Sequence, residues 1–74
     1  MKKSKSIVYE TARSMLSVRL LRIWQVELLT GAKKSWIWAS VSDGSFPKPI
    51  KLSSRITAWR GQDVLDWMDS RGGL

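Results

Sequence analysis

The spacing of apolar residues in the middle of the chain predicts two short helices separated by a glycine. One helix is expected over residues 25–30 and the second over residues 34–42, because apolar side chains recur three or four positions apart in each. Gly31 directly follows the first helix, and glycine takes the left-handed conformation that ends helices at no steric cost. Two helices joined by so short a turn make a helix-turn-helix. The apolar residues expected to face the core from these helices are Val26, Leu29, Ile37 and Val41.

The pattern becomes extended after the second helix. That helix is expected to end at an Asp-Gly-Ser sequence, and the two prolines within residues 46–49 exclude a helix through their neighbours. Apolar residues then alternate or cluster over residues 50–52 and 56–59. Because the polar residues Ser53-Ser54-Arg55 separate these two runs, the pattern predicts a β-hairpin.

A last helix is expected over residues 62–69, where Val64, Trp67 and Met68 follow helical spacing. Residues 20–23 are expected to form a short extended lead-in to the first helix of the pair. The order helix, helix, hairpin, helix predicts an α+β fold, a small winged helix-turn-helix with a two-stranded wing. The residues assigned to its core are Val26, Ile37, Phe46, Trp59, Val64 and Trp67.

The N-terminal region, residues 1–18, is polar and basic and has two alternative interpretations. It is either a short amphipathic helix or a disordered basic arm, because isolated helices of this length are marginal unless they dock. The predicted organisation is therefore this extension, a DNA-binding domain over residues 19–70 and a frayed end over residues 71–74. Initiation at Met15 is a hypothesis that N-terminal sequencing of the native protein would decide. The apolar residues at helical spacing in the extension are Val8, Ala12, Met15 and Leu16.

The net charge of +7 on 74 residues points to a polyanionic partner. Residues 1–22 and residues 33–60 each carry a net charge of +5, whereas residues 61–74 carry −2. The positive charge therefore lies in the tail and the middle of the chain. The acidic last segment is expected to be structural.

The composition disfavours several classes of function. The chain has no cysteine and no histidine, so we expect no disulfide, no metal site and no cofactor. Catalysis is also disfavoured, because the one carboxylate cluster, Asp63, Asp66 and Asp69, has the spacing of a solvated helix face. We find no export signal or membrane span, and a cytoplasmic, nucleoid-associated location is expected.

The start of the second helix and the hairpin hold the candidate DNA contacts. A recognition helix presents its first residues to base edges and phosphates in the major groove, and an arginine at a wing tip suits a narrow minor groove. The alternatives are a solvated helix start with a serine cap, solvated strand charges, core roles for the two tryptophans, and a salt bridge from Arg60 to Asp63. The candidate residues are Lys33, Lys34, Ser35, Trp36, Trp38, Lys48, Lys51, Arg55, Arg60 and Arg22.

Three stretches of the sequence form a recognisable combination. Residues 21–31 contain Leu21-Arg22-Ile23 and a short helix that ends at a glycine, residues 46–52 read Phe-Pro-Lys-Pro-Ile-Lys-Leu, and residues 59–67 begin with Trp-Arg and end with a second tryptophan. Across this region, about two thirds of the chain, the sequence resembles the AlpA family of phage regulatory proteins, which are winged-helix relatives of the excisionases and of the MerR-type DNA-binding domain. The resemblance implies double-stranded DNA as the ligand and a role in transcription from prophage or mobile-element promoters.

The sequence also departs from the family pattern. Trp38 takes the place of the usual tyrosine, and Trp36 and Ala39 stand where polar or basic residues are common, so base preference cannot be carried over. Ser53 replaces a glycine that is frequent in the wing turn. The residues before position 18 have no counterpart in the family pattern.

Two other functions compete with transcription regulation. An excisionase-type directionality factor, which bends DNA for an integrase, uses the same fold and the same groove contacts. A protein-interaction or RNA-binding module is the third class, although no aromatic-rich sheet for stacking bases is expected. A module of this size buries on the order of 600–1,000 Å² on DNA, so we expect a dimer or a cooperative array on repeated sites.

Overall fold

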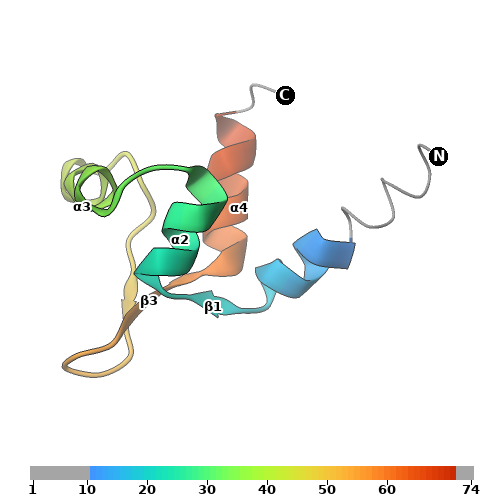
Figure 1. Ribbon diagram of the computed structural model, residues 1–74, viewed down its shortest axis with the longest axis horizontal. Helices are drawn as coiled ribbons and strands as arrows, with labels where there is room; N and C mark the ends of the chain where they lie inside the picture. The colour runs from blue at the N-terminus through green and yellow to red at the C-terminus, as the bar shows by residue number, and fades with distance from the viewer. Residues whose placement is uncertain (1–10, 72–74) are drawn as a thin grey trace.

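A computed structural model describes residues 11–71, which contain four helices and a three-stranded antiparallel sheet (Figure 1). The first helix covers residues 11–17 of the described part. The elements that follow are β1 (Leu20–Leu21), α2 (Ile23–Thr30), α3 (Lys34–Asp43), β2 (Ile50–Lys51), β3 (Thr57–Arg60) and α4 (Gly61–Ser70). The predicted α+β winged helix-turn-helix is confirmed, with α2 and α3 as the helix pair and the β2–β3 hairpin as the wing.

The ends of α2 and α3 are fixed by local hydrogen bonds and by glycine. The helix α2 begins two residues earlier than predicted, because the side-chain oxygen of Gln25 accepts a hydrogen bond from the N–H of Arg22 at 2.8 Å. Gly31 ends α2 with a φ of 75°, and its N–H donates to the carbonyl of Glu27 at 2.8 Å. Gly44 ends α3 in the same way with a φ of 86°. Both left-handed positions carry the one residue type that adopts them without strain.

The sheet has one strand more than the sequence predicted. Its order is β1-β3-β2, so β3 lies in the middle and pairs antiparallel with both neighbours. Leu20 and Leu21, expected only as an extended lead-in, pair with Arg60 and Trp59. The wing itself pairs Ile50 with Ala58 and Lys51 with Thr57.

The wing turn closes without glycine. The hydroxyl of Ser53 accepts hydrogen bonds from the N–H groups of Arg55 and Ile56 at 3.3 and 3.2 Å. Across the described part of the chain, no residue other than glycine has a positive φ. The turn therefore needs no left-handed position, and Ser53 supplies a hydrogen-bond acceptor where the family often has glycine.

The core lies where the helix pair, β3 and α4 meet. Five of the six predicted core residues are buried, and Trp67 is half-buried and packs against them. Leu21 and Leu65 are buried as well, although the sequence did not single them out. The indole N–H of Trp59 donates to the carbonyl of Pro47 at 2.8 Å, which fixes the proline segment that leads into the wing. The fully buried members of the core are Leu21, Val26, Ile37, Ala58, Trp59 and Val64.

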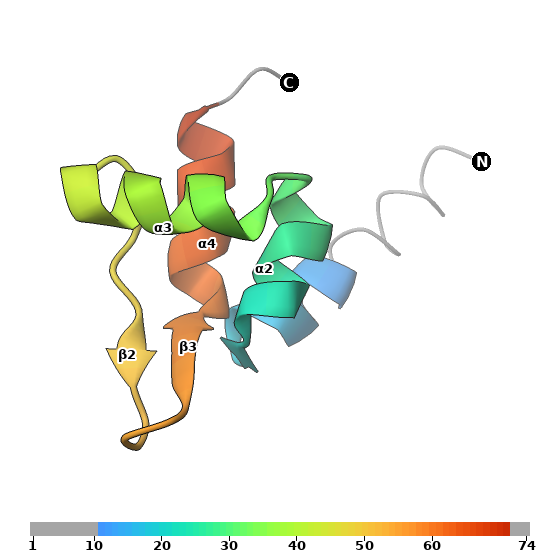
Figure 2. The same cartoon turned by 60° about the vertical axis from the view of Figure 1, so that its left-hand side comes forward.

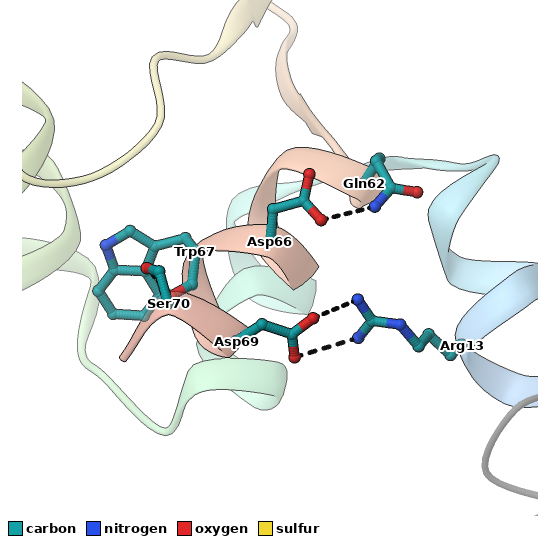
Figure 3. Close-up of polar contacts among 6 residues, drawn as sticks. All are labelled: Arg13, Gln62, Asp66, Trp67, Asp69 and Ser70. Atoms are coloured by element: carbon teal, nitrogen blue, oxygen red, sulfur yellow. Dashed lines mark hydrogen bonds and ion pairs between the residues drawn. The ribbon is translucent and has the colours of Figure 1, made fainter. Parts of the chain in front are cut away.

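Residues 11–17 take the helical alternative and dock against the domain, whereas residues 1–10 and 72–74 lie outside the described residues. Leu16 packs against the core. The two terminal guanidinium nitrogens of Arg13 donate to the carboxylate of Asp69 on α4 (Figure 3). The helix end and α4 approach so closely that the N–H of Gly61 donates to the carbonyl of Arg19 at 2.8 Å. This contact requires glycine, because a Cβ at position 61 would lie 1.8 Å from the carbonyl oxygen of Leu16.

Candidate nucleic-acid interface

The exposed side of α3 is lined by small side chains. Ile37 is fully buried, and helical spacing places Ser35, Ala39 and Ser42 on the opposite side of the helix, where all three are exposed. Ser35 is among the predicted DNA contacts, whereas Ser42 is not. Small side chains on this side leave the helix backbone open to close approach by a partner.

The two tryptophans of α3 flank this small face and are each partly buried. Trp36 is 47% exposed, and its ring lies edge-on to Phe46 and Trp67 at centroid distances of 6.5 and 6.1 Å. Trp38 is 38% exposed and lies 5.2 Å from the ring of Trp59. Each indole thus has one side against the domain and another side open. The core and contact interpretations of these residues are compatible.

The start of α3 carries two exposed lysines and one acidic neighbour. Lys33 is the N-cap residue, and no side chain caps the helix at that position. Instead, the carboxylate of Glu27 on α2 accepts a hydrogen bond from the N–H of Lys34 at 3.0 Å. Ser35 lies inside the first turn of α3, so the alternative in which a serine caps this helix is wrong. One of the free amides of the helix start is therefore already occupied by an anion.

The wing and the proline segment that leads into it carry three exposed cations. Lys48 lies between the two prolines, Lys51 lies in β2, and Arg55 lies at the hairpin turn. Figures 1 and 2 place α3 and the β2–β3 hairpin along the same side of the molecule, away from residues 11–17. The two elements that carry or adjoin these cations thus lie along one side of the molecule.

Arg22 and Arg60 form a second basic location, where Arg22 follows the edge strand β1 and Arg60 ends the central strand β3. Arg60 pairs in register with Leu20, which lies two residues before Arg22, and both arginines are exposed. Within residues 11–71 the one ion pair joins Arg13 to Asp69, so the alternative of a salt bridge from Arg60 to Asp63 is wrong. These two arginines are not part of the wing.

The acidic residues Asp66 and Asp69 of α4 make contacts with neighbouring side chains of the domain. Figure 3 shows Asp69 directed toward Arg13 and Trp67 on the opposite side of the helix. Asp66 accepts a hydrogen bond from the amide nitrogen of Gln62 at 2.7 Å. The carboxylates thus make local contacts, as a structural role for this segment requires.

One more carboxylate lies at the end of α3. Asp43 accepts hydrogen bonds from the hydroxyl and the N–H of Ser45 at 2.6 and 2.9 Å. These bonds favour the charged form and hold the pKa of Asp43 below its ordinary value. The group is exposed and stabilises the turn into the wing.

The fold and this basic side define a small winged helix-turn-helix protein. Residues 19–72 match the family described as Prophage CP4-57 regulatory protein (AlpA), and the chain belongs to this AlpA family of prophage regulators. It is 34% identical over 53 residues to a protein of Enterobacteria phage P4 named Uncharacterized protein ORF88. The alignment covers 72% of this chain and 60% of the phage protein. No solved structure matches the chain.

The family is regulatory and is not a family of enzymes. Among the described residues, no group of three or more acidic, histidine or cysteine side chains is arranged to hold a metal ion. Over the same residues, no helix has the length and apolar character to span a bilayer.

Proposed function

We propose that the protein binds double-stranded DNA in a sequence-specific manner and regulates transcription of a prophage or mobile element. In this proposal α3 enters the major groove, and the β2–β3 hairpin contacts the adjacent minor groove or the backbone. The DNA-binding domain is residues 19–70, and the protein acts in the cytoplasm on the nucleoid. Family membership supports the regulatory role, and the surface supports the ligand.

One observation carries the proposal most directly. Five exposed cations lie in or next to α3 and the hairpin, two elements that Figure 2 shows along one side of the molecule, and within residues 11–71 none of them makes an ion pair. Unpaired cations gathered on one side attract a polyanion and release its counterions on binding. These five residues are Lys33, Lys34, Lys48, Lys51 and Arg55.

The form of α3 favours a groove over a flat surface. Its outer side carries Ser35, Ala39 and Ser42, so the helix can sit deep in a groove without bulky side chains in the way. The open side of Trp38 can pack on sugars or on thymine methyl groups.

The carboxylate of Glu27 determines how phosphate is held near α3. Because Glu27 occupies the amide of Lys34, a phosphate at that amide would meet a negative charge. We therefore assign phosphate contacts in this region to the side chains of Lys33 and Lys34, and we expect the helix dipole to contribute little.

The excisionase-type role remains the competing proposal, and it would add an integrase as a partner. Both roles use the same DNA surface, so the difference lies in the shape of the bound DNA. A circular-permutation assay that finds a strong bend would favour the excisionase role, and unbent operator DNA would favour regulation alone.

The test is selection from random duplex pools at two salt concentrations, with the wild-type chain and the Lys34→Ala/Arg55→Ala variant. We expect an enriched motif that the variant no longer binds. If about five cations neutralise phosphates, log affinity should fall against log salt with a slope of roughly −4 to −5. Each of the two substitutions should reduce that slope by about one.

Arg71→Gln is the matched control, because it removes one exposed cation at the end of α4, where Arg71 stacks on Trp67 at 4.9 Å. It should leave the motif and the slope nearly unchanged. A slope change for Arg71→Gln as large as that expected for Lys34→Ala or Arg55→Ala alone would indicate binding governed by net charge. Absence of binding to any duplex would overturn the proposal.

A further inference from the structure

We propose that the outer face of α2, formed by Trp24 and Leu28, is the contact surface for a second copy of this chain. The contact itself depends on α2 alone. Its role, which is to join neighbouring copies on DNA, rests on the proposed function.

The two side chains project directly away from the domain. Val26 of the same helix is fully buried, and Ile23 and Leu29 pack against the core. Helical spacing puts Trp24 and Leu28 on the opposite side, where they are 58% and 76% exposed. Trp24 and Leu28 are neither in the core cluster nor among the residues packed against it, so their exposed apolar surface is free to meet a partner.

This face is complementary to itself. Two α2 helices can pack antiparallel through these outer faces, about a two-fold axis that lies between the helices at the height of Val26 along each one. Trp24 of each copy then lies opposite the partner's Leu28. The large side chain of one helix thus meets the smaller side chain of the other, twice. A two-fold contact needs this reciprocity, and a contact with an unrelated protein does not.

The charges on α2 also suit the antiparallel arrangement. Arg22, at the start of α2, would lie beside the last turn of the partner helix, which carries no basic side chain and forms the negative end of its dipole. The Gln25 side chains of the two copies would lie on one flank of the contact and the two Glu27 side chains on the other, at the edge of the contact, where each Glu27 accepts the N–H of its own Lys34.

The area available sets the strength of the contact. A tryptophan buries about 150–250 Å² when fully covered, so two partly exposed side chains per copy give on the order of 600 Å² in total. Stable dimers bury about 1,200–2,000 Å². The contact is therefore transient in free solution, and we expect it to form when DNA holds two copies at high local concentration.

Concentration-dependent NMR of the full chain tests the contact without DNA. The chain has five tryptophans and hence five indole N–H signals. The Trp24 signal should shift from micromolar to millimolar concentration, while that of buried Trp59 stays fixed. Leu28→Ser should abolish the shift of Trp24, and Val18→Ser, at an 84% exposed residue outside α2, should leave it intact.

Crosslinking then tests the contact on DNA, because the chain has no cysteine of its own. A Leu28→Cys variant with a short bismaleimide should give covalent dimers on a duplex long enough for two copies, and a Ser54→Cys variant at the wing turn should not.

A fixed Trp24 signal together with no crosslink, on a duplex that demonstrably binds two copies, would overturn the proposal. So would a Trp24 shift caused by one copy binding a short duplex, because the face would then contact DNA. If no duplex is bound but the Trp24 shift appears, the contact stands and the proposed function fails.

Discussion

At the scale of single residues, Gly61 joins the N-terminal helix to the domain. The Gly61→Ala substitution places a methyl group 1.8 Å from the carbonyl oxygen of Leu16, and that oxygen also accepts the N–H of Arg19 at 3.1 Å. Because backbone atoms must move, we expect a loss of about 1–3 kcal/mol in the free energy of unfolding. Urea denaturation measures the loss, and amide exchange at Arg19 should become faster.

Gly31→Ala separates this clash from ordinary backbone strain. No atom lies within 4 Å of a Cβ at position 31, but the φ of 75° costs an alanine about 1 kcal/mol. That variant should lose stability without faster exchange at Arg19. Wild-type stability and exchange in Gly61→Ala would mean that residues 11–17 are not seated against α4.

We expect Glu27 to have opposite effects on stability and on DNA affinity. It caps α3 through the N–H of Lys34, so Glu27→Ala should lower the free energy of unfolding by about 1 kcal/mol. Glu27→Gln keeps an acceptor for that amide but removes a negative charge beside the proposed phosphate contacts. Its affinity for duplex DNA should rise by about 0.5–1 kcal/mol, roughly two- to fivefold, at low salt.

Fluorescence titration of a labelled duplex, paired with urea denaturation of both variants, checks the two effects. An unchanged affinity in Glu27→Gln would place the DNA phosphates away from the start of α3. An Ala variant as stable as the wild type would remove the capping role.

At the scale of elements, local patterns were sufficient where the structure depends on neighbours in sequence. The helix pair followed from the spacing of Val26, Leu29, Ile37 and Val41, and Gly31 fixed its turn. The prolines and the apolar alternation located the wing. Boundaries moved by one or two residues because the Gln25 side chain and Gly44 cap the helices outside the apolar pattern.

Contacts between segments that are distant in the sequence could not be predicted from local patterns. Strand β1 exists because Leu20 and Leu21 pair with Arg60 and Trp59, which lie much later in the chain. The helix at residues 11–17 is held by Leu16 in the core and by Arg13 on Asp69, and neither partner is visible from spacing within the helix. The ten candidate site residues could be selected by charge and position, but the role of Glu27 at the start of α3 depends on the turn that brings α2 and α3 together.

At the scale of the whole molecule, the elements with the candidate DNA contacts and the acidic last helix have different neighbours. Helix α3 and the β2–β3 hairpin lie along one side, whereas residues 11–17 lie away from that side and Asp69 of α4 faces Arg13 (Figures 1 and 3). The apolar face of α2, formed by Trp24 and Leu28, is exposed as well. In our two proposals the domain presents one surface to DNA and another to a second copy of itself.

The central claim is that α3 and the wing are the surface that meets DNA. Mapping amide shifts of the isotope-labelled chain on addition of a short duplex tests it most directly, because every element reports separately. We predict the largest changes over residues 33–39 and 53–56, with the amide of Asp66 on α4 unchanged. Changes centred on α4 or on the outer face of α2, with α3 and the hairpin unmoved, would contradict the account.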